Sequence, residues 1–126
     1  GKKVGLSPEK RDELREINFG CWEGLTLQEI EQRFPGQLAE RSKDRHFTPQ
    51  GGESMVSVSN RVQNFRSMLE GRGFEPDNRI LIVSHAYTLR ILVIQLMGLS
   101  LKHLFDFRLD NTGISCLNDT CHLHKI

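Results

Sequence analysis

The chain has 126 residues, and 17 basic residues against 16 acidic ones leave a formal net charge of +1 at pH 7. This length is within the usual size of one domain, so we expect residues 1–126 to form a single domain. The small net charge creates no global field that would attract nucleic acid or a membrane surface. No apolar run approaches the roughly 20 residues that span a bilayer. The first ten residues contain no signal peptide, so we expect a cytoplasmic protein.

The first clear element in chain order is a helix that begins after Thr26. Thr26 and Glu29 form the T-x-x-E pattern of a capping box, and Pro35-Gly36 marks the end of the helix. The following residues, 37–50, are polar and have no strong period. We therefore expect them to form an irregular surface segment over a sheet.

A longer amphipathic helix is predicted over residues 55–71. Its apolar residues recur at three- and four-residue steps, and Gly71 marks its end. We expect Glu53 and Ser54 to cap this helix, because both immediately precede it.

A short apolar run followed at once by a second helical pattern comes next. Residues 80–83 read Ile-Leu-Ile-Val after Arg79, which is typical of a strand covered on both faces. From Ala86 to Met97 apolar residues recur at helical spacing, and Gly98 is a plausible C′ residue. His85 therefore falls at the carboxyl end of a strand and at a helix N-terminus, where open α/β sheets bind ligands and anions are favoured.

The C-terminal residues predict a short helix over 101–105, a turn over 110–113 and a hairpin. A two-residue turn at Asn118-Asp119 would place Cys116 opposite Cys121. Strand alternation then puts both cysteines on one face and His122 and His124 on the other, which disfavours a zinc site built from these four residues. We expect reduced core cysteines, no disulfide, no metal and no cofactor. Together the elements predict a mixed α/β domain with a partly parallel sheet.

Three segments, in this order, resemble the histidine phosphatase superfamily. They are residues 14–24 (Leu-Arg-Glu-Ile-Asn-Phe-Gly-Cys-Trp-Glu-Gly), the Gly-Gly-Glu-Ser at 51–54, and the segment around His85. The resemblance covers residues 12–117 and is nearest to phosphoglycerate mutase-like phosphatases of the α-ribazole phosphatase type. It implies an α/β three-layer sandwich with a mostly parallel sheet.

The family's opening strand, which ends in Arg-His-Gly with the nucleophilic histidine, has no counterpart in this sequence. The only Arg-His pair is Arg45-His46, which lies in a polar stretch and precedes Phe47 rather than glycine. The chain therefore resembles the C-terminal portion of such a protein, without the N-terminal strand-helix units, and we expect it to be inactive alone. Since the missing strand would lie beside residues 79–84, we expect a complementing N-terminal segment or a segment-exchanged homo-oligomer.

The resemblance also assigns roles to individual residues. His85 corresponds to the family's second histidine, which contacts the phosphoryl oxygens, and the N–H group of Ala86 would add a backbone donor. Glu16 corresponds to the general acid, with Glu23 as the alternative. Trp22 is expected to contribute to substrate binding.

The function implied is hydrolysis of a small phosphomonoester, such as α-ribazole phosphate, through a phosphohistidine whose nucleophile lies outside this chain. Two alternatives stay open. One is a phosphoglycerate mutase, for which the segment between Trp22 and Glu53 is short. The other is a non-catalytic binding module.

Overall fold

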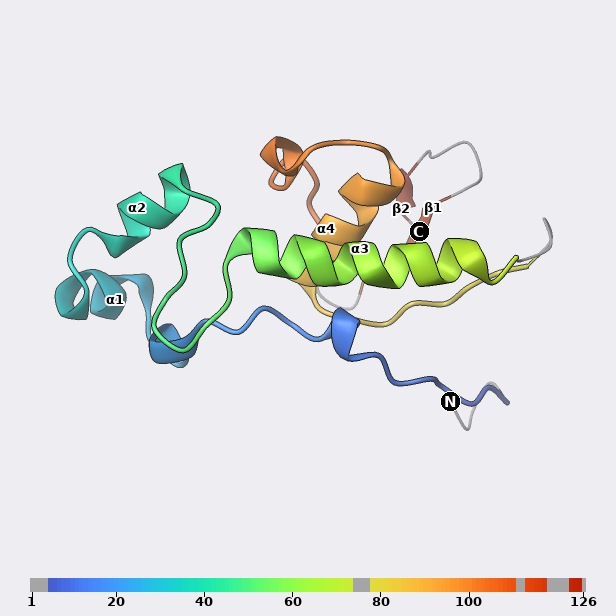
Figure 1. Cartoon of the computed structure of the whole chain (residues 1–126), viewed down its shortest axis with the longest axis horizontal. Helices are drawn as coiled ribbons and strands as arrows, with labels where there is room; N and C mark the ends of the chain where they lie inside the picture. The colour runs from blue at the N-terminus through green and yellow to red at the C-terminus, as the bar shows by residue number, and fades with distance from the viewer. Residues whose placement is uncertain (1–4, 74–77, 111–112, 118–122, 126) are drawn as a thin grey trace.

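The computed structural model describes residues 5–73, 78–110, 113–117 and 123–125. The long helix α3 (Met55–Gly71) lies at the centre of the molecule and packs against α4 (Ala86–Leu96) (Figure 1). Helices α1 (Leu27–Arg33) and α2 (Gln37–Lys43) lie beyond one end of α3. Single 3-10 turns occur at η2 (Asp12–Leu14), η3 (Gly20–Trp22) and η4 (Leu101–His103), and strand β1 (Ser115–Leu117) pairs with β2 (Leu123–Lys125). Among these residues, no helix combines the length and the apolar character needed to cross a membrane.

The core forms where the apolar faces of α3 and α4 meet. Residues at three- and four-residue steps along α3 are almost fully buried. They pack against residues of α4, against Ile17 from the segment before α1 and against Leu104 from the segment after α4. The buried set is Ile17, Val58, Val62, Phe65, Ile91, Leu92, Ile94 and Leu104. The sequence prediction of both helices is confirmed, including the glycine stop after α4, since Gly98 adopts a φ of 67°.

Helix α1 begins with the predicted capping box. The Thr26 side chain accepts from the backbone N–H of Glu29, and the Glu29 carboxylate accepts from the backbone N–H of Thr26. The expectation of an irregular segment after this helix is wrong, because residues 37–43 form α2. A two-turn helix is too short to show a clear period, and its half-buried Leu38 and Arg41 face the pocket beside Trp22, so tertiary contacts stabilise it.

The predicted buried strand at residues 80–83 is not a strand in this structure. Ile80, Leu81 and Val83 are 48%, 71% and 82% exposed, and only Ile82 packs against the core. A strand requires a neighbour for its backbone groups, and none of the described residues supplies one here. The mostly parallel sheet of the expected three-layer sandwich is therefore not confirmed within the described residues, where the two-stranded antiparallel pair is the only sheet.

The C-terminal hairpin has a different register from the predicted one. Cys116 pairs with His124, not with Cys121, because five residues rather than two separate the strands. Cys116 is exposed, which corrects its expected place in the core. Cys121 and His122 lie outside the described residues, and within the described part of the chain no three potential metal ligands cluster.

Candidate active site

Two segments far apart in the sequence meet at the N-terminus of α4. The Ser84 hydroxyl donates to the carbonyl oxygen of Leu14, and the fully buried Thr88 hydroxyl donates to the carbonyl oxygen of Arg15 at 2.7 Å. These side-chain-to-backbone bonds hold the extended residues after η2 against the first turn of α4. Glu16 is thereby carried to this end of the helix.

The Glu16 carboxylate caps the open end of α4. It accepts a hydrogen bond from its neighbour Ile17 N–H at 3.0 Å and longer ones from the Tyr87 and Thr88 N–H groups, each at 3.4 Å. The first N–H groups of a helix have no partner within the helix, and the helix dipole favours a negative charge there. The position therefore favours a negatively charged group, such as a carboxylate or an anionic ligand.

His85 and Ala86 lie at the same helix end as Glu16. His85 is the N-cap residue of α4 in an extended conformation, with φ −109° and ψ 157°. Its exposed side chain makes no capping hydrogen bond, so the imidazole is available to a ligand. Ala86 is the first residue of the helix. The structure thus brings together three of the four residues that the sequence singled out.

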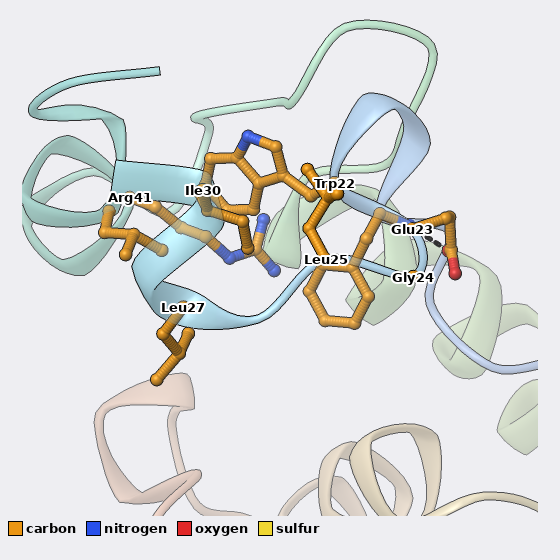
Figure 2. Close-up of a pocket in the computed structure, with 9 residues that line it drawn as sticks. Trp22, Glu23, Gly24, Leu25, Leu27, Ile30 and Arg41 are labelled. Atoms are coloured by element: carbon orange, nitrogen blue, oxygen red, sulfur yellow. Dashed lines mark hydrogen bonds between the residues drawn. The ribbon is translucent and has the colours of Figure 1, made fainter. Parts of the chain in front are cut away.

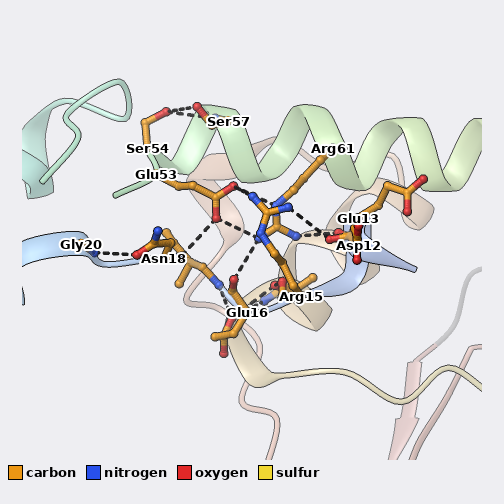
Figure 3. Close-up of polar contacts among 12 residues, drawn as sticks. Asp12, Glu13, Arg15, Glu16, Asn18, Gly20, Glu53, Ser54, Ser57 and Arg61 are labelled. Carbon is orange, nitrogen blue, oxygen red and sulfur yellow. Dashed lines mark hydrogen bonds and ion pairs between the residues drawn. The ribbon is translucent and has the colours of Figure 1, made fainter. Parts of the chain in front are cut away.

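A carboxylate and two arginines fix the position of the Glu16 segment (Figure 3). Glu53 Oε1 pairs with Arg15 at 2.7 Å and with Arg61 at 3.1 Å, and its other oxygen accepts from the backbone N–H of Asn18. Arg61 also donates to the carbonyl oxygens of Glu13 and Glu16, at 2.6 and 3.2 Å. Arg61 therefore connects α3 directly to the backbone of the candidate acid.

This network changes the role expected for Glu53. Ser54 is the N-cap of α3, as predicted, but Glu53 binds arginines instead of capping the helix. Burial acts to raise the pKa of Glu53, yet the hydrogen bonds from Arg61 and Asn18 and the charges of Arg61 and Arg15 outweigh it, so the pKa lies below its usual value. Sequence reasoning missed Arg61, because a charged residue on an amphipathic helix carries no signal of a distant partner.

Two glycines allow the Gly-Gly-Glu-Ser loop to approach the Glu16 segment. A Cβ atom on Gly20 would lie 2.2 Å from the carbonyl oxygen of Gln50, and one on Gly52 would lie 2.8 Å from that of Asn18. Two backbone hydrogen bonds stabilise this close approach: the Cys21 N–H donates to the carbonyl oxygen of Gln50, and the Glu53 N–H donates to that of Asn18. The loop therefore positions Glu53, and its glycines are required by backbone contact.

Trp22, the fourth predicted site residue, lies apart from the other three, in a pocket of about 330 Å³ beside α1 and α2 (Figure 2). Its ring is 4% exposed and stacks on Phe47 with centroids 5.7 Å apart. Glu23, the alternative acid, also lines this pocket. Its carboxylate accepts a hydrogen bond from the backbone N–H of Phe19 at 2.7 Å. Of the two carboxylates, only Glu16 accepts hydrogen bonds from the first turn of α4.

Comparison with known proteins gives consistent matches. A model of the histidine phosphatase superfamily (branch 1) matches residues 1–122. Phosphoserine phosphatase 1 of Hydrogenobacter thermophilus is 31% identical over 127 residues, which cover 90% of this chain and 59% of that protein. Adenosylcobalamin/α-ribazole phosphatase of Escherichia coli is 31% identical over 99 residues, 78% of this chain and 48% of its own length.

A solved structure shows the same similarity. The crystal structure of the α-ribazole phosphatase from Shigella flexneri matches with a TM-score of 0.77 and 28% identity, over 93% of this chain and 58% of that chain. The chain thus spans about half to three-fifths of the length of these relatives.

Proposed function

Because the chain belongs to the histidine phosphatase superfamily (branch 1), we propose that it supplies the general acid and a phosphate-stabilising histidine of a phosphomonoesterase. The observation that carries this proposal is the placement of Glu16 and His85 at one end of α4. A proton donor and a group that binds phosphoryl oxygens must act on the same substrate. Glu16 and His85, the candidates for these two roles, are 69 positions apart in the sequence, and both lie at the N-terminal end of α4.

The proposed reaction has two steps. A histidine nitrogen attacks phosphorus, the bond from phosphorus to the ester oxygen breaks, and Glu16 gives its proton to the departing oxygen. Water then attacks the phosphohistidine, Glu16 takes a proton from that water, and the bond from phosphorus to nitrogen breaks. In both steps His85 and the N–H of Ala86 stabilise the charge on the equatorial oxygens, which is the main source of catalysis in phosphoryl transfer.

We place the nucleophile outside residues 1–126. His46 is the only histidine that follows an arginine in this sequence, and it lies on an exposed loop. That loop follows α2, beyond one end of α3, whereas Glu16 is bound at the N-terminus of α4. The complete enzyme would therefore join the nucleophile from another segment to the two groups held here.

The substrate is a small phosphomonoester. Two of the relatives are named for phosphoserine and for α-ribazole, so the relatives support the reaction class while differing in the leaving group. We keep α-ribazole phosphate as one candidate among such esters. The protein would act in the cytoplasm, where metabolites of this kind are found.

The exposed apolar side chains of Ile80, Leu81 and Val83 support a structural part of the proposal. Leu81 and Val83 are mostly exposed although both are strongly apolar, and the β-branched Val83 also favours a strand. We propose that a further strand pairs with this segment, from a complementing N-terminal segment or from a second copy that exchanges segments.

The test compares leaving groups in the complete protein. His85→Ala should lower kcat by about 100-fold for every ester, which is the effect of losing one donor to transition-state charge. Glu16→Gln should slow the first step, measured as release of the leaving group in a single turnover, strongly for alkyl phosphates but much less for p-nitrophenyl phosphate, because p-nitrophenolate leaves without a proton. Equal losses in this first step for both ester classes would remove Glu16 from the acid role.

Two controls accompany this test. His46→Ala changes an exposed loop histidine and should leave kcat unchanged. Residues 1–126 alone should show no steady turnover of p-nitrophenyl phosphate. Appreciable turnover by this polypeptide that survives His46→Ala would mean that another residue of 1–126 is the nucleophile. That result would overturn the proposal that the nucleophile lies outside these residues.

A further inference from the structure

The two carboxylate oxygens of Glu16 have unequal surroundings. Oε1 accepts hydrogen bonds from the backbone N–H of Ile17 at 3.0 Å, from the N–H of Thr88 at 3.4 Å and from the Thr88 hydroxyl at 3.2 Å. Oε2 accepts one long hydrogen bond, from the N–H of Tyr87 at 3.4 Å. Among the described residues, three of these four donors therefore bind Oε1, and Oε2 keeps a lone pair for another partner.

The Thr88 hydroxyl is placed to hold Oε1. Thr88 lies in the first turn of α4 and is fully buried. Within a helix, a threonine hydroxyl commonly bonds to the carbonyl oxygen three or four residues earlier. This one instead lies 2.7 Å from the carbonyl oxygen of Arg15 and 3.2 Å from Glu16 Oε1. Both oxygens are within hydrogen-bond reach of its single proton, so one side chain ties two adjacent residues to α4.

The occupation of Oε1 decides where the Glu16 carboxyl group carries a proton. A carboxylate oxygen has two lone pairs, and the three donors around Oε1 use both. A proton on Oε1 would displace at least one of these donors and leave it unpaired, which is costly for a buried group such as the Thr88 hydroxyl. A proton on Oε2 meets no such conflict, because that oxygen accepts a single long bond.

We infer that Thr88 is a positioning residue for the acid: its hydroxyl holds Glu16 Oε1, so that Oε2 is the oxygen that transfers the proton. This inference rests on the proposed phosphomonoesterase function and specifies one part of its mechanism. In the first step the Oε2–H bond breaks, and the proton goes to the ester oxygen, which also receives the electron pair of its bond to phosphorus. In the second step Oε2 takes a proton from the attacking water.

Ser84 provides a natural comparison for Thr88. Its hydroxyl also comes from this end of α4 and also donates to a backbone carbonyl of the Glu16 segment, that of Leu14. The two hydroxyls therefore share the task of holding the segment, and the contact with the carboxylate distinguishes Thr88. Variants of the two residues separate the positioning of the carboxylate from the positioning of the backbone.

The first experiment measures release of the leaving group in single turnovers of the complete protein. Thr88→Val, which keeps the side-chain shape, should slow release from ethyl phosphate by about tenfold, the effect of losing a hydrogen bond to a charged group. Release from p-nitrophenyl phosphate should change less than about twofold, because p-nitrophenolate leaves without a proton. Thr88→Ser keeps the hydroxyl and should restore the rate with ethyl phosphate. The ester concentration that gives half the maximal rate should not change in either variant.

Two controls show whether Thr88 acts through the carboxylate. Ser84→Ala removes a bond to the same segment and should leave the ratio of the two ester rates unchanged. In a Glu16→Gln background, Thr88→Val should slow ethyl phosphate less than about twofold further, because residues that act through one group are not additive. A fall of the ratio in Ser84→Ala equal to that in Thr88→Val, or a full tenfold further loss in the double variant, would overturn the inference.

An NMR measurement keeps the two proposals apart. The Ile17 amide proton reports on Oε1 without turnover, since a charge-assisted hydrogen bond shifts its resonance downfield. Thr88→Val should move this resonance upfield, and Thr88→Ser and Ser84→Ala should leave it in place. This pattern without hydrolysis of any ester would support the hold of Thr88 on Oε1, and the hydrolase proposal would fail. Hydrolysis in which Glu16→Gln spares only p-nitrophenyl phosphate, but Thr88→Val slows neither ester, would overturn the inference and leave the hydrolase proposal intact.

Discussion

At the scale of single residues, the candidate site depends on groups that hold Glu16 in place. Glu53 is bound by two arginines and a backbone N–H, and Arg61 bonds to the carbonyl oxygen of Glu16 itself. These charge-assisted bonds are short and directional. We regard Glu53 and Arg61 as positioning residues that fix the backbone of the Glu16 segment.

The lowered pKa of Glu53 predicts how its contribution to stability depends on pH. A carboxyl group whose pKa is lower in the folded state stabilises the protein above its unfolded value of 4.5, and the contribution is lost as the pH falls through the folded pKa. Glu53→Gln should therefore reduce the free energy of unfolding at pH 7 by about 1–2 kcal/mol, a value discounted for the exposed Arg15 partner.

Urea unfolding at several pH values measures this effect. The difference between the wild-type protein and Glu53→Gln should be constant from pH 7 to about pH 5 and should shrink below 4.5, where the wild-type carboxylate becomes protonated. Glu40→Gln, at an exposed position of α2, is the matched control and should show little difference at any pH. A Glu53→Gln difference that grows on acidification would contradict the stabilising role of the ionised group.

At the scale of elements, the stability of the short helices α1 and α2 depends on interactions at their ends more than the stability of α3 and α4 does. Each has seven residues, a length at which a helix is marginal by itself. The capping box joins Thr26 and Glu29 at the start of α1, and Ile30, one residue later, is buried beside the aromatic pocket. The cap therefore helps to shape the pocket that contains Arg41.

Thr26→Ala should loosen α1 without unfolding the rest of the protein. Loss of an N-cap hydroxyl should speed amide hydrogen exchange in α1 by about fivefold, which corresponds to the free energy that a typical N-cap hydrogen bond contributes to helix stability. Exchange in α3 should be unaffected, because α3 is capped independently by Ser54. Thr48→Ala removes a hydroxyl that bonds to a loop carbonyl, so it serves as the control. Faster exchange in α3 as well would mean that the two regions unfold together.

At the scale of the whole molecule, the exposed apolar side chains of Ile80, Leu81 and Val83 predict association. Leu81 and Val83 are 71% and 82% exposed on a segment that lacks a strand partner among the described residues. Light scattering on the polypeptide of residues 1–126 should therefore show dimers or larger species. The double substitution Leu81→Lys with Val83→Lys should shift it toward monomer, because charges on an open edge oppose strand pairing.

Leu6→Lys is the matched control, since Leu6 is also an exposed apolar residue, 60% exposed, but lies on another segment. It should leave the association unchanged. A monodisperse wild-type monomer with slow amide exchange at residues 80–83 would contradict the proposal, because the segment would then be protected without any added strand.

The amino-acid sequence by itself determined the features that depend on local chemistry. Helices α3 and α4, the capping box of α1 and the glycine stop at Gly98 follow from periodicity and from side chains that act within one or two turns. The resemblance to the family followed from three segments, and the match over residues 1–122 confirms it.

Only the tertiary structure decided the features that depend on distant partners. The Glu53–Arg61 network, the hairpin register and the contact of Arg41 with the Trp22 ring each join residues whose contact leaves no local signal in the sequence. The same reason explains the incorrect prediction at residues 80–83. Their composition favours a strand, but strand formation is a property of a pair of segments, and a partner for this segment is absent from the described residues.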